Sequence, residues 1–238
     1  MKKGIVYCIH LAGVGHMKRM LTLCEGLLSF AEITFVQGGP EVNMTIKHPN
    51  FHHIKLPITP EMSNPNQIIK NKTLFAKSIK TMTARKKQLF VQADLSEHYD
   101  FVIIEQLPFS KLFWINEVVA MIETVKKINP KALIISSHKG TTREENKFLS
   151  LKDQSIYKGC DTRTLFYLNN YFDVIMVHSD PRLIKIDDNF YKKDEIADKV
   201  FYTGFISKSY DHSMIPNRKD KHILITVGSG LKFSLILN

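Results

Sequence analysis

Six short apolar runs constrain the fold of this chain more than any other feature of its sequence. They cover residues 5–9, 33–36, 101–104, 132–135, 174–177 and 223–227. The runs are rich in β-branched residues and almost free of polar interruptions. Nearly continuous runs of this length are typical of strands that are covered on both faces, whereas half-exposed strands alternate between apolar and polar residues.

Longer segments of helical character separate these runs. They cover residues 16–30, 67–95, 110–128 and 160–171. Strands that alternate with helices predict an α/β fold, here a doubly wound, Rossmann-like parallel sheet with helices on its faces. Ligands of such sheets bind beyond the carboxyl ends of the strands. The residues that directly follow each run are therefore the candidates for a functional site.

Two of the apolar runs lead directly into glycines. Gly13 and Gly15 follow the first run, and Gly228 and Gly230 follow the last. After Gly230 only LKFSLILN remains, whereas a helical crossover to another parallel strand needs about a dozen residues or more. We therefore expect an incomplete second domain. The expected division is a first domain at 1–186, a linker at 187–221, and the first strand and glycine turn of the second domain at 222–238.

The cysteines and the hydropathy of the sequence indicate the cellular compartment of the protein. Cys8 and Cys24 lie in apolar segments and Cys160 makes the number odd, which favours reduced, buried thiols over a disulfide framework. His10 and His16 interrupt the N-terminal apolar run near the expected cleavage site of a signal peptide. No run reaches the roughly 18 apolar residues of a membrane span. We expect a cytoplasmic protein, with any membrane contact peripheral and at the inner face.

The formal net charge of +10 is concentrated in one predicted helix. Residues 62–93 contain no Asp or Glu, and apolar residues recur at helical spacing within them, at Ile68, Phe75, Ile79, Met82 and Leu89. This pattern predicts a basic amphipathic helix. Three interpretations stay open: its apolar stripe packs on the sheet with the basic side chains in water, residues 68–90 bind an anionic membrane surface, or the helix contacts nucleic acid. No recognisable nucleic-acid-binding motif accompanies the charge, so specific nucleic-acid binding is not expected.

The first glycine turn is the sharpest functional signal. Gly13 and Gly15 permit a tight turn, and His16 then lies in the first turn of a helix, where free amides and the helix dipole favour an anion. Lys18 stands where a dinucleotide fingerprint has its third glycine, and the Gly-Lys-Ser/Thr ending of a nucleotide P-loop is absent. The alternative is a glycine turn that only joins strand to helix, with His16 as its cap.

Neither a metal site nor a bound cofactor is expected. The histidines show no H-E-x-x-H spacing and the cysteines form no C-x-x-C pair. His52 and His53 are neighbours on a predicted strand, so their side chains point to opposite faces.

Several segments together resemble a known family in the same order along the chain. GVGHMKRMLTLCEGLL, VIIEQLPFSK, IMVHSDPR, VFYTGFI and ILITVGSG are similar to successive landmarks of GT-B glycosyltransferases. The similarity is greatest to a predicted group that resembles the N-acetylglucosaminyl transferase of peptidoglycan synthesis. It covers most of the chain and is strongest at residues 4–30, 100–114 and 173–230.

The resemblance implies two doubly wound domains that face each other across a cleft, with the acceptor bound mainly by the first and a nucleotide-sugar co-substrate mainly by the second. It implies that His16 is the general base on an acceptor hydroxyl and that Glu105 orients it. The alternative for Glu105 is a carboxylate that caps the helix near Ser110. The expected substrate-binding residues are Gly13, Gly15, Lys18, Arg19, Gln106, His138, His178 and Asp180, and the expected donor-binding residues are Gly228 and Gly230.

Two of these assignments have structural alternatives. His138 is alternatively part of a solvated loop, and the segment of His178 and Asp180 is alternatively a turn before Pro181. The expected function is sugar transfer to a hydroxyl or phosphate of an unknown acceptor. As it stands the chain would be inactive or would need a partner chain that supplies the donor domain. The other hypotheses are a non-catalytic module that docks to an anionic membrane or a protein partner, and an inactive remnant.

Overall fold

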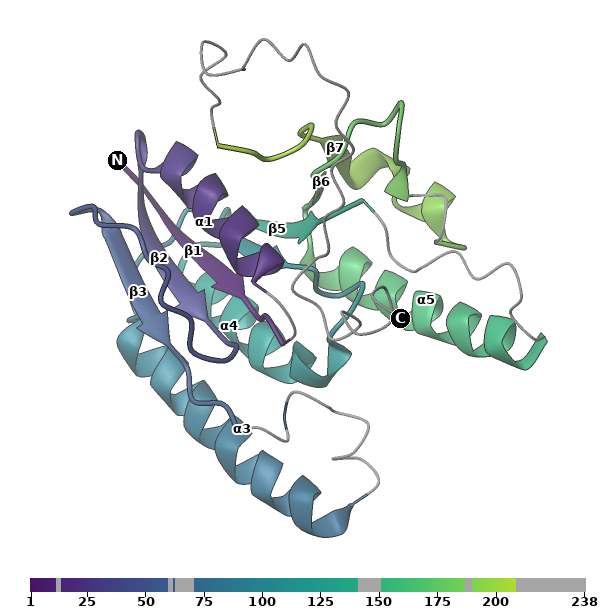
Figure 1. Ribbon diagram of the computed structural model, residues 1–238, viewed down its shortest axis with the longest axis horizontal. Helices are drawn as coiled ribbons and strands as arrows, with labels where there is room; N and C mark the ends of the chain where they lie inside the picture. The colour runs from purple at the N-terminus through teal and green to yellow at the C-terminus, as the bar shows by residue number, and fades with distance from the viewer. Residues whose placement is uncertain (12–13, 60–61, 63–70, 141–150, 187–189, 209–238) are drawn as a thin grey trace, which may run out of the picture.

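The computed structural model describes residues 1–11, 14–59, 62, 71–140, 151–186 and 190–208 (Figure 1). Within them the chain forms a single parallel sheet. Its strands are β1 Lys2–Cys8, β2 Ala31–Gln37, β3 Phe51–Lys55, β4 Phe101–Glu105, β5 Leu133–His138, β6 Val174–Val177 and β7 Val200–Tyr202. The seven strands lie in the order β3-β2-β1-β4-β5-β6-β7. The predicted doubly wound α/β fold is confirmed.

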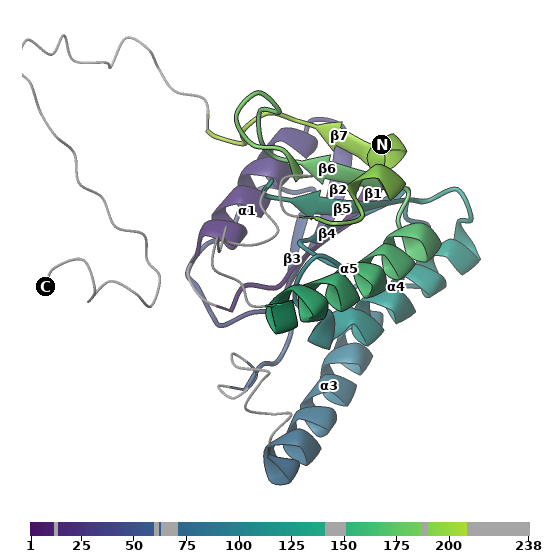
Figure 2. The same ribbon diagram turned by 90° about the vertical axis from the view of Figure 1, so that its right-hand side faces the viewer.

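Helices cover both faces of this sheet. The α-helices are α1 Gly15–Leu27, α3 Lys72–Gln92, α4 Ile115–Ile128 and α5 Leu151–Tyr171. Three short 3-10 helices are η2 Leu112–Trp114, η4 Lys193–Glu195 and η5 Ala197–Lys199. Figure 2 shows α1 on one face of the sheet and α4 and α5 on the other, with α3 extending away from the body.

The buried strand β1 shows why the sequence folds this way. Ile5 and Tyr7 pack in the cluster beneath α3, α4 and α5, whereas Val6 and Cys8 pack in the cluster beneath α1. Successive side chains of a strand point to opposite faces, so a run with no polar residue fits only a strand covered on both sides. Cys8 and Cys24 are both buried and free, and burial raises the pKa of each thiol.

The order of the strands places the functional edge of the sheet. From β1 the chain moves outward through β2 to β3, and from β4 it moves the other way through β5 and β6 to β7. The order in which strands are added to the sheet therefore reverses between the adjacent parallel strands β1 and β4. These two strands are paired from Gly4–Phe101 to Tyr7–Ile104. We call this place the reversal of the sheet. Open α/β sheets bind their ligands at such a reversal, beyond the carboxyl ends of the strands. The segment after β1 and the end of β4 flank this place.

The sheet extends further along the chain than the sequence predicted. β7 pairs with β6 from Ile175–Val200 to Val177–Tyr202, inside the segment 187–221 that we expected to be a linker. Ile186, Phe190 and Ile196 are buried in the same core, so their apolar packing holds this polar segment on the domain. The division into two domains with a linker between them stays a prediction. The predicted strand at 223–227 lies outside the described residues.

The basic helix α3 differs from the expected amphipathic pattern in two ways. Phe75 and Ile79 of the predicted apolar stripe are 47% and 48% exposed, and one basic residue is buried. Arg85 is fully buried and its guanidinium is paired with Glu117 of α4, with Nε–Oε2 at 3.1 Å and Nη2–Oε1 at 3.2 Å. The Tyr7 hydroxyl donates to Glu117 Oε1 at 2.5 Å, and the Arg85 guanidinium carbon lies 4.5 Å from the centre of the Trp114 ring. We call Arg85, Glu117, Tyr7 and Trp114 the Arg85 cluster. Arg85 is thus a core residue and does not belong to a solvated basic face.

The described helices include none with both the length and the apolar character needed to cross a bilayer.

Candidate functional site at the reversal of the sheet

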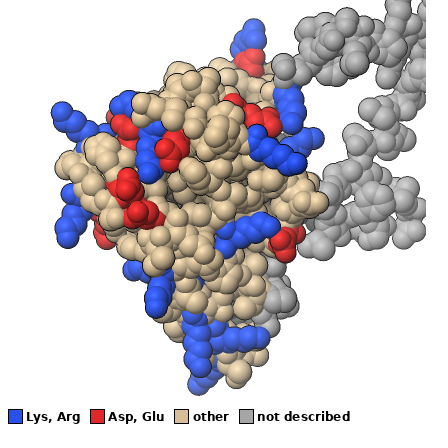
Figure 3. Space-filling model, turned by 90° about the vertical axis from the view of Figure 1, so that its left-hand side faces the viewer, with Lys and Arg blue, Asp and Glu red and all other residues tan. Residues whose placement is uncertain are grey.

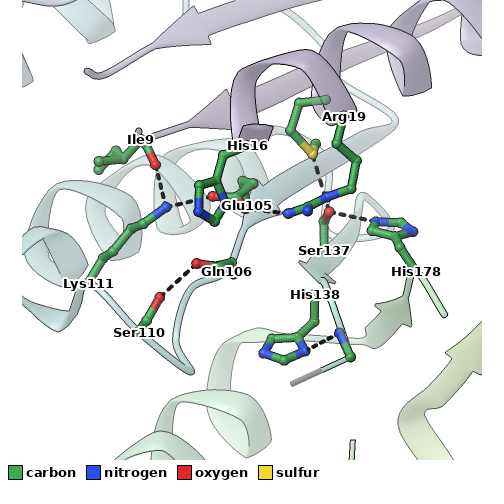
Figure 4. A network of polar contacts seen from close by, with 12 residues as sticks. Ile9, His16, Arg19, Glu105, Gln106, Ser110, Lys111, Ser137, His138 and His178 are labelled. Carbon is green, nitrogen blue, oxygen red and sulfur yellow. Dashed lines mark hydrogen bonds and ion pairs between the residues drawn. The ribbon is translucent and has the colours of Figure 1, made fainter. Parts of the chain in front are cut away.

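Glu105, the last residue of β4, is the centre of a polar network at the reversal (Figure 4). Its carboxylate is completely buried and has three cationic or cationisable partners. Oε1 lies 2.6 Å from His16 Nδ1 and 2.7 Å from Arg19 Nη2, and Oε2 lies 2.7 Å from Lys111 Nζ. A buried carboxylate is retained only when such partners satisfy it.

The partners also decide the charge of Glu105. Burial by itself raises the pKa of this carboxyl, but the hydrogen bond with His16 and the positive charge of Lys111 outweigh it and lower the pKa to about 2. Glu105 is therefore ionised at any physiological pH. An ionised carboxylate only accepts hydrogen bonds, so His16 Nδ1 must carry the hydrogen of the bond between them.

His16 is the second residue of α1, and Gly15 begins this helix. The residue at the N-cap position is Val14, and no side chain caps the helix, so His16 does not have the capping role that was its alternative. With Nδ1 occupied by Glu105, Nε2 has no hydrogen-bond partner among the residues that the structure describes. The side chain is 24% exposed. His16 therefore presents an open proton acceptor at the edge of the sheet.

The other predicted residues of α1 separate into two roles. Arg19 directs its guanidinium at Glu105, so it belongs to the network. Lys18 is exposed. Gly15, Lys18, Arg19 and Thr22 line an open pocket of about 380 Å³ together with residues 206–208. This pocket adjoins the His16 site and is bordered by basic side chains.

Lys111 is the one member of the network that the sequence analysis missed. Its Nζ bonds both Glu105 Oε2 and the carbonyl oxygen of Ile9. Its backbone has a φ of 59°, which is the left-handed conformation that only a few per cent of non-glycine residues adopt. No motif signals this residue, because its contact depends on the turn between β4 and η2.

Gln106 shapes that turn. Its backbone has a φ of 60°, its N–H donates to the Ser137 carbonyl at 2.8 Å, and its Oε1 accepts from the Ser110 hydroxyl at 3.2 Å. The side chain is largely buried. Neither η2 nor α4 has a side-chain cap at its start, so Glu105 does not have the helix-capping role that was its alternative. Gln106 thereby orders the segment that carries Lys111.

His138 and His178 are buried behind the site. His138 packs on Phe109, with ring centroids 4.6 Å apart, and its Nδ1 accepts from the Gly140 N–H at 3.0 Å. His178 uses both ring nitrogens, with Ser137 Oγ at 2.7 Å and Thr203 Oγ1 at 2.8 Å. Burial lowers the pKa of His138 to about 3 and that of His178 to about 4. Both rings are therefore neutral and packed, and His138 is not in the solvated loop that was its alternative.

Asp180 lies apart from the network, in the turn that follows β6. Its carboxylate pairs with Arg182, and Asp180 Oδ1 also accepts from the Arg182 backbone N–H at 2.9 Å. Its backbone carbonyl accepts from Leu183 and Ile184. These contacts describe the turn that was the alternative for this segment. Gly13, Gly228 and Gly230 lie outside the described residues.

Residues with metal-binding side chains do not gather at the site. In the described part of the chain no group of three or more His, Cys, Asp or Glu side chains could hold a metal ion. His52 and His53 contact different partners, Glu32 and Gln37 respectively, as expected for neighbours on β3.

No protein-family model matches the chain, and no curated protein matches it. A UDP-glucosyltransferase from Polygonum tinctorium capable of glucosylating indoxyl aligns over 93% of this chain and 55% of its own, with a TM-score of 0.51 and 11% identity.

Two further solved structures give similar alignments. UGT2 of Phytolacca americana, complexed with UDP-2-fluoro-glucose and pterostilbene, covers 88% of this chain and 55% of its own at a TM-score of 0.48 and 11% identity. CalG4, the calicheamicin glycosyltransferase, covers 85% and 53% at a TM-score of 0.47 and 12% identity. This chain spans about half the length of these proteins.

The fold and the first comparison define the class of domain. The chain forms an α/β Rossmann-like domain with a seven-stranded parallel sheet, and it corresponds to about half of a GT-B glycosyltransferase chain. At this low identity the likeness concerns the fold. The closer resemblance to the N-acetylglucosaminyl transferase group stays a prediction.

Proposed function

We propose that this chain is the acceptor-side half of a glycosyltransferase that uses a nucleotide-sugar, with His16 as the general base. The observation that carries the proposal is the 2.6 Å contact between His16 Nδ1 and the buried, ionised Glu105. The contact lies near the carboxyl ends of β1 and β4, where the order of the strands in the sheet reverses, which is the usual ligand position of this fold. The fold resemblance to GT-B enzymes supports the same reading.

The chemistry follows from the orientation of the imidazole. Its Nδ1–H donates to Glu105, which leaves the lone pair of Nε2 to accept a proton from an acceptor hydroxyl. The hydroxyl oxygen then bonds the anomeric carbon of the sugar, and the bond from that carbon to the nucleotide diphosphate breaks. The imidazolium that forms is stabilised by Glu105, and a histidine side chain suits this proton transfer near neutral pH.

The donor site is the part of the proposal that the described residues do not contain. The expected donor-binding residues Gly228 and Gly230 lie outside them, and the chain spans about half of the solved glycosyltransferases. We therefore propose that a further segment or a partner chain binds most of the nucleotide-sugar. Cytosolic placement, where nucleotide-sugars are made, fits the buried free thiols of Cys8 and Cys24.

The test supplies that missing half. The chain is fused after residue 208 to the donor domain of a GT-B glucosyltransferase, and release of UDP from UDP-glucose is measured over a panel of hydroxyl and phosphate acceptors. We expect His16→Ala to reduce turnover about 100-fold or more. His52→Ala, which removes an exposed histidine from β3, is the matched control and leaves turnover unchanged.

Two results would contradict the proposal. One is turnover that His16→Ala leaves intact. The other is absence of transfer and of nucleotide-sugar binding by calorimetry in a fusion whose two halves are both shown to be folded.

A second candidate function is favoured by the surface of α3. Phe75 and Ile79 lie one turn apart and are 47% and 48% exposed, and the helix contains no acidic residue. Figure 3 shows Lys and Arg side chains, and no Asp or Glu, along the projecting lower end of the molecule to which α3 belongs. Exposed apolar side chains among lysines fit a surface that binds anionic lipid. In this reading the chain docks peripherally on a membrane, with or without transferase activity.

Vesicle sedimentation separates this candidate from an ordinary solvated helix. Vesicles that contain phosphatidylglycerol should retain the protein, and vesicles of phosphatidylcholine alone should not. The double variant Phe75→Ser and Ile79→Ser should lose most of the binding, whereas Val91→Ser, at a 70% exposed position near the other end of α3, should keep it. Binding that depends on charge but not on Phe75 and Ile79 would instead indicate non-specific attraction to polyanions.

A further inference from the structure

Lys111 connects the two strands that flank the reversal of the sheet. Its Nζ binds the carbonyl of Ile9, just beyond β1, and the carboxylate of Glu105, at the end of β4. The side chain is only 10% exposed. Figure 4 shows it reaching the carboxylate from the side opposite to Arg19.

The two oxygens of Glu105 have different partners as a result. Oε2 is held by Lys111, and Oε1 is shared by His16 Nδ1 and Arg19 Nη2. Lysine and arginine can only donate hydrogen bonds. They keep the carboxylate in its acceptor form, so His16 must donate a hydrogen bond through Nδ1 rather than accept one there.

We propose that Lys111 is a positioning residue of the His16 site: by holding Glu105 Oε2 it directs Oε1 at His16 and fixes the imidazole as the Nδ1–H tautomer, with Nε2 free to accept a proton. The inference rests on the proposed function for its purpose, since a fixed tautomer matters only if His16 acts as a base. Its structural content stands on the contacts alone.

The backbone conformation around Lys111 indicates that the turn holds this side chain in place. The left-handed conformation of Lys111 directs the chain from β4 into η2, where its carbonyl accepts from the Trp114 N–H at 3.0 Å. Ser110 N–H also donates to the Gln106 carbonyl at 3.0 Å. An unfavourable backbone conformation persists only where its surroundings determine it, and such residues cluster at functional sites.

A purely structural role is the alternative. In that case Lys111 would serve to satisfy the Ile9 carbonyl, and its removal would lower stability without affecting the state of His16. The experiment must therefore read the tautomer and the carboxylate directly.

Nuclear magnetic resonance gives both readings without donor or acceptor. Nitrogen-15 shifts of the histidine rings report the tautomer of His16 near neutral pH, with His16→Gln used to assign its signals. Carbon-13 labelling of glutamate carboxyls reports the titration of Glu105, assigned with Glu105→Gln. The other titratable groups around this carboxylate, which stay in place in each variant, are Cys8, His10, His138 and His178.

Lys111→Met should change both readings. The nitrogen-15 shifts of His16 should move from the pure Nδ1–H tautomer toward a mixture of tautomers, because Glu105 is no longer held at Oε2. The pKa of Glu105 should rise by about one pH unit or more, since one neighbouring cation is lost. Lys111→Arg keeps the positive charge and should restore most of the carboxylate titration.

Lys126→Met is the matched control. It removes a lysine that pairs with Asp173 at 3.1 Å on the surface, and it should change neither reading. If Lys111→Met does not give a folded spectrum, Lys111→Gln replaces it, with the same changes expected in both readings.

An unchanged tautomer and an unchanged Glu105 titration in a folded Lys111→Met variant would overturn the inference. This outcome is independent of sugar transfer. A fixed tautomer together with absent transfer would instead count against the proposed function and leave the positioning role in place.

Discussion

Two buried carboxylates on the same domain, Glu117 and Glu105, have partners that are similar in chemistry but differ in their access to solvent. Glu117 pairs with Arg85 and Tyr7, and each of these side chains is closed off from water. Glu105 pairs with His16, Arg19 and Lys111, whose side chains are 24%, 18% and 10% exposed. The chemistry of the pairs is alike. The two networks therefore differ in the access of the partners to solvent and not in the burial of the carboxylate.

The largest expected effect comes from the closed pair. Arg85→Met leaves Glu117 as a buried carboxylate without its cation, and we expect it to lower the free energy of unfolding by about 3–5 kcal/mol. Arg19→Met should lower it by only about 1–2 kcal/mol, because Glu105 keeps two partners and water can reach the site. Urea unfolding at pH 7 measures both. Equal losses would remove the distinction between the two carboxylates.

As the pH falls, the packing around the buried residues His138 and His178 should lose stability before the Arg85 cluster does. His138 and His178 are neutral in the fold, with each pKa lowered by burial, to about 3 and about 4. An unfolded histidine binds a proton below about 6.5, so their contribution to stability is complete above that pH and falls toward pH 4. We expect a loss of about 2–4 kcal/mol between pH 6.5 and pH 5.

Unfolding curves at several pH values test this slope. His178→Gln should flatten it, and His52→Gln, at an exposed position, should not. A stability that stays constant from pH 7 to pH 5 would show that the two buried rings do not control the acid response.

The smallest effect sharpens the role of Glu105 itself. Glu105→Gln should cost about 1–2 kcal/mol at pH 7, through weaker hydrogen bonds to Arg19 and Lys111. The pKa of Glu105 is lowered from 4.5 to about 2, so its contribution is present above pH 4.5 and is lost as the pH falls toward 2. The difference between wild type and variant should shrink over this window. A difference that does not depend on pH would mean that the charge of Glu105 does not stabilise the fold.

The sheet was predictable because its central strands are nearly continuous apolar runs. The run at 174–177 matches β6 residue for residue, and the other four described runs differ from their strands only at the ends. β7 was missed because it has three residues, Val200–Tyr202, within a polar segment. Such a strand forms through pairing with β6 and not through its own pattern.

The site was predictable in part for a related reason. The strand-end rule pointed to the segments of His16 and Glu105, and the pairing of these two residues was implied by the family resemblance. Lys111 could not be placed, since its reach depends on the left-handed turn after Gln106. His138 ends β5 just as Glu105 ends β4, and both are buried, but His138 packs on Phe109 whereas Glu105 contacts His16. A strand-end position therefore predicts proximity to the edge of the sheet and not exposure at it.

The Arg85 cluster also has a consequence for how this domain can diverge. Besides Glu117, the Arg85 guanidinium donates to the carbonyls of Pro57 at 2.7 Å and Gly38 at 3.3 Å, so one side chain joins segments from four separate parts of the chain. A variant that loses only one of the two charged partners should be strongly destabilised, because the other charge is left buried and unpaired. Replacement of both by well-packed apolar residues need not destabilise the domain. Positions 85 and 117 should therefore covary in homologous sequences, either retaining both charges or changing together.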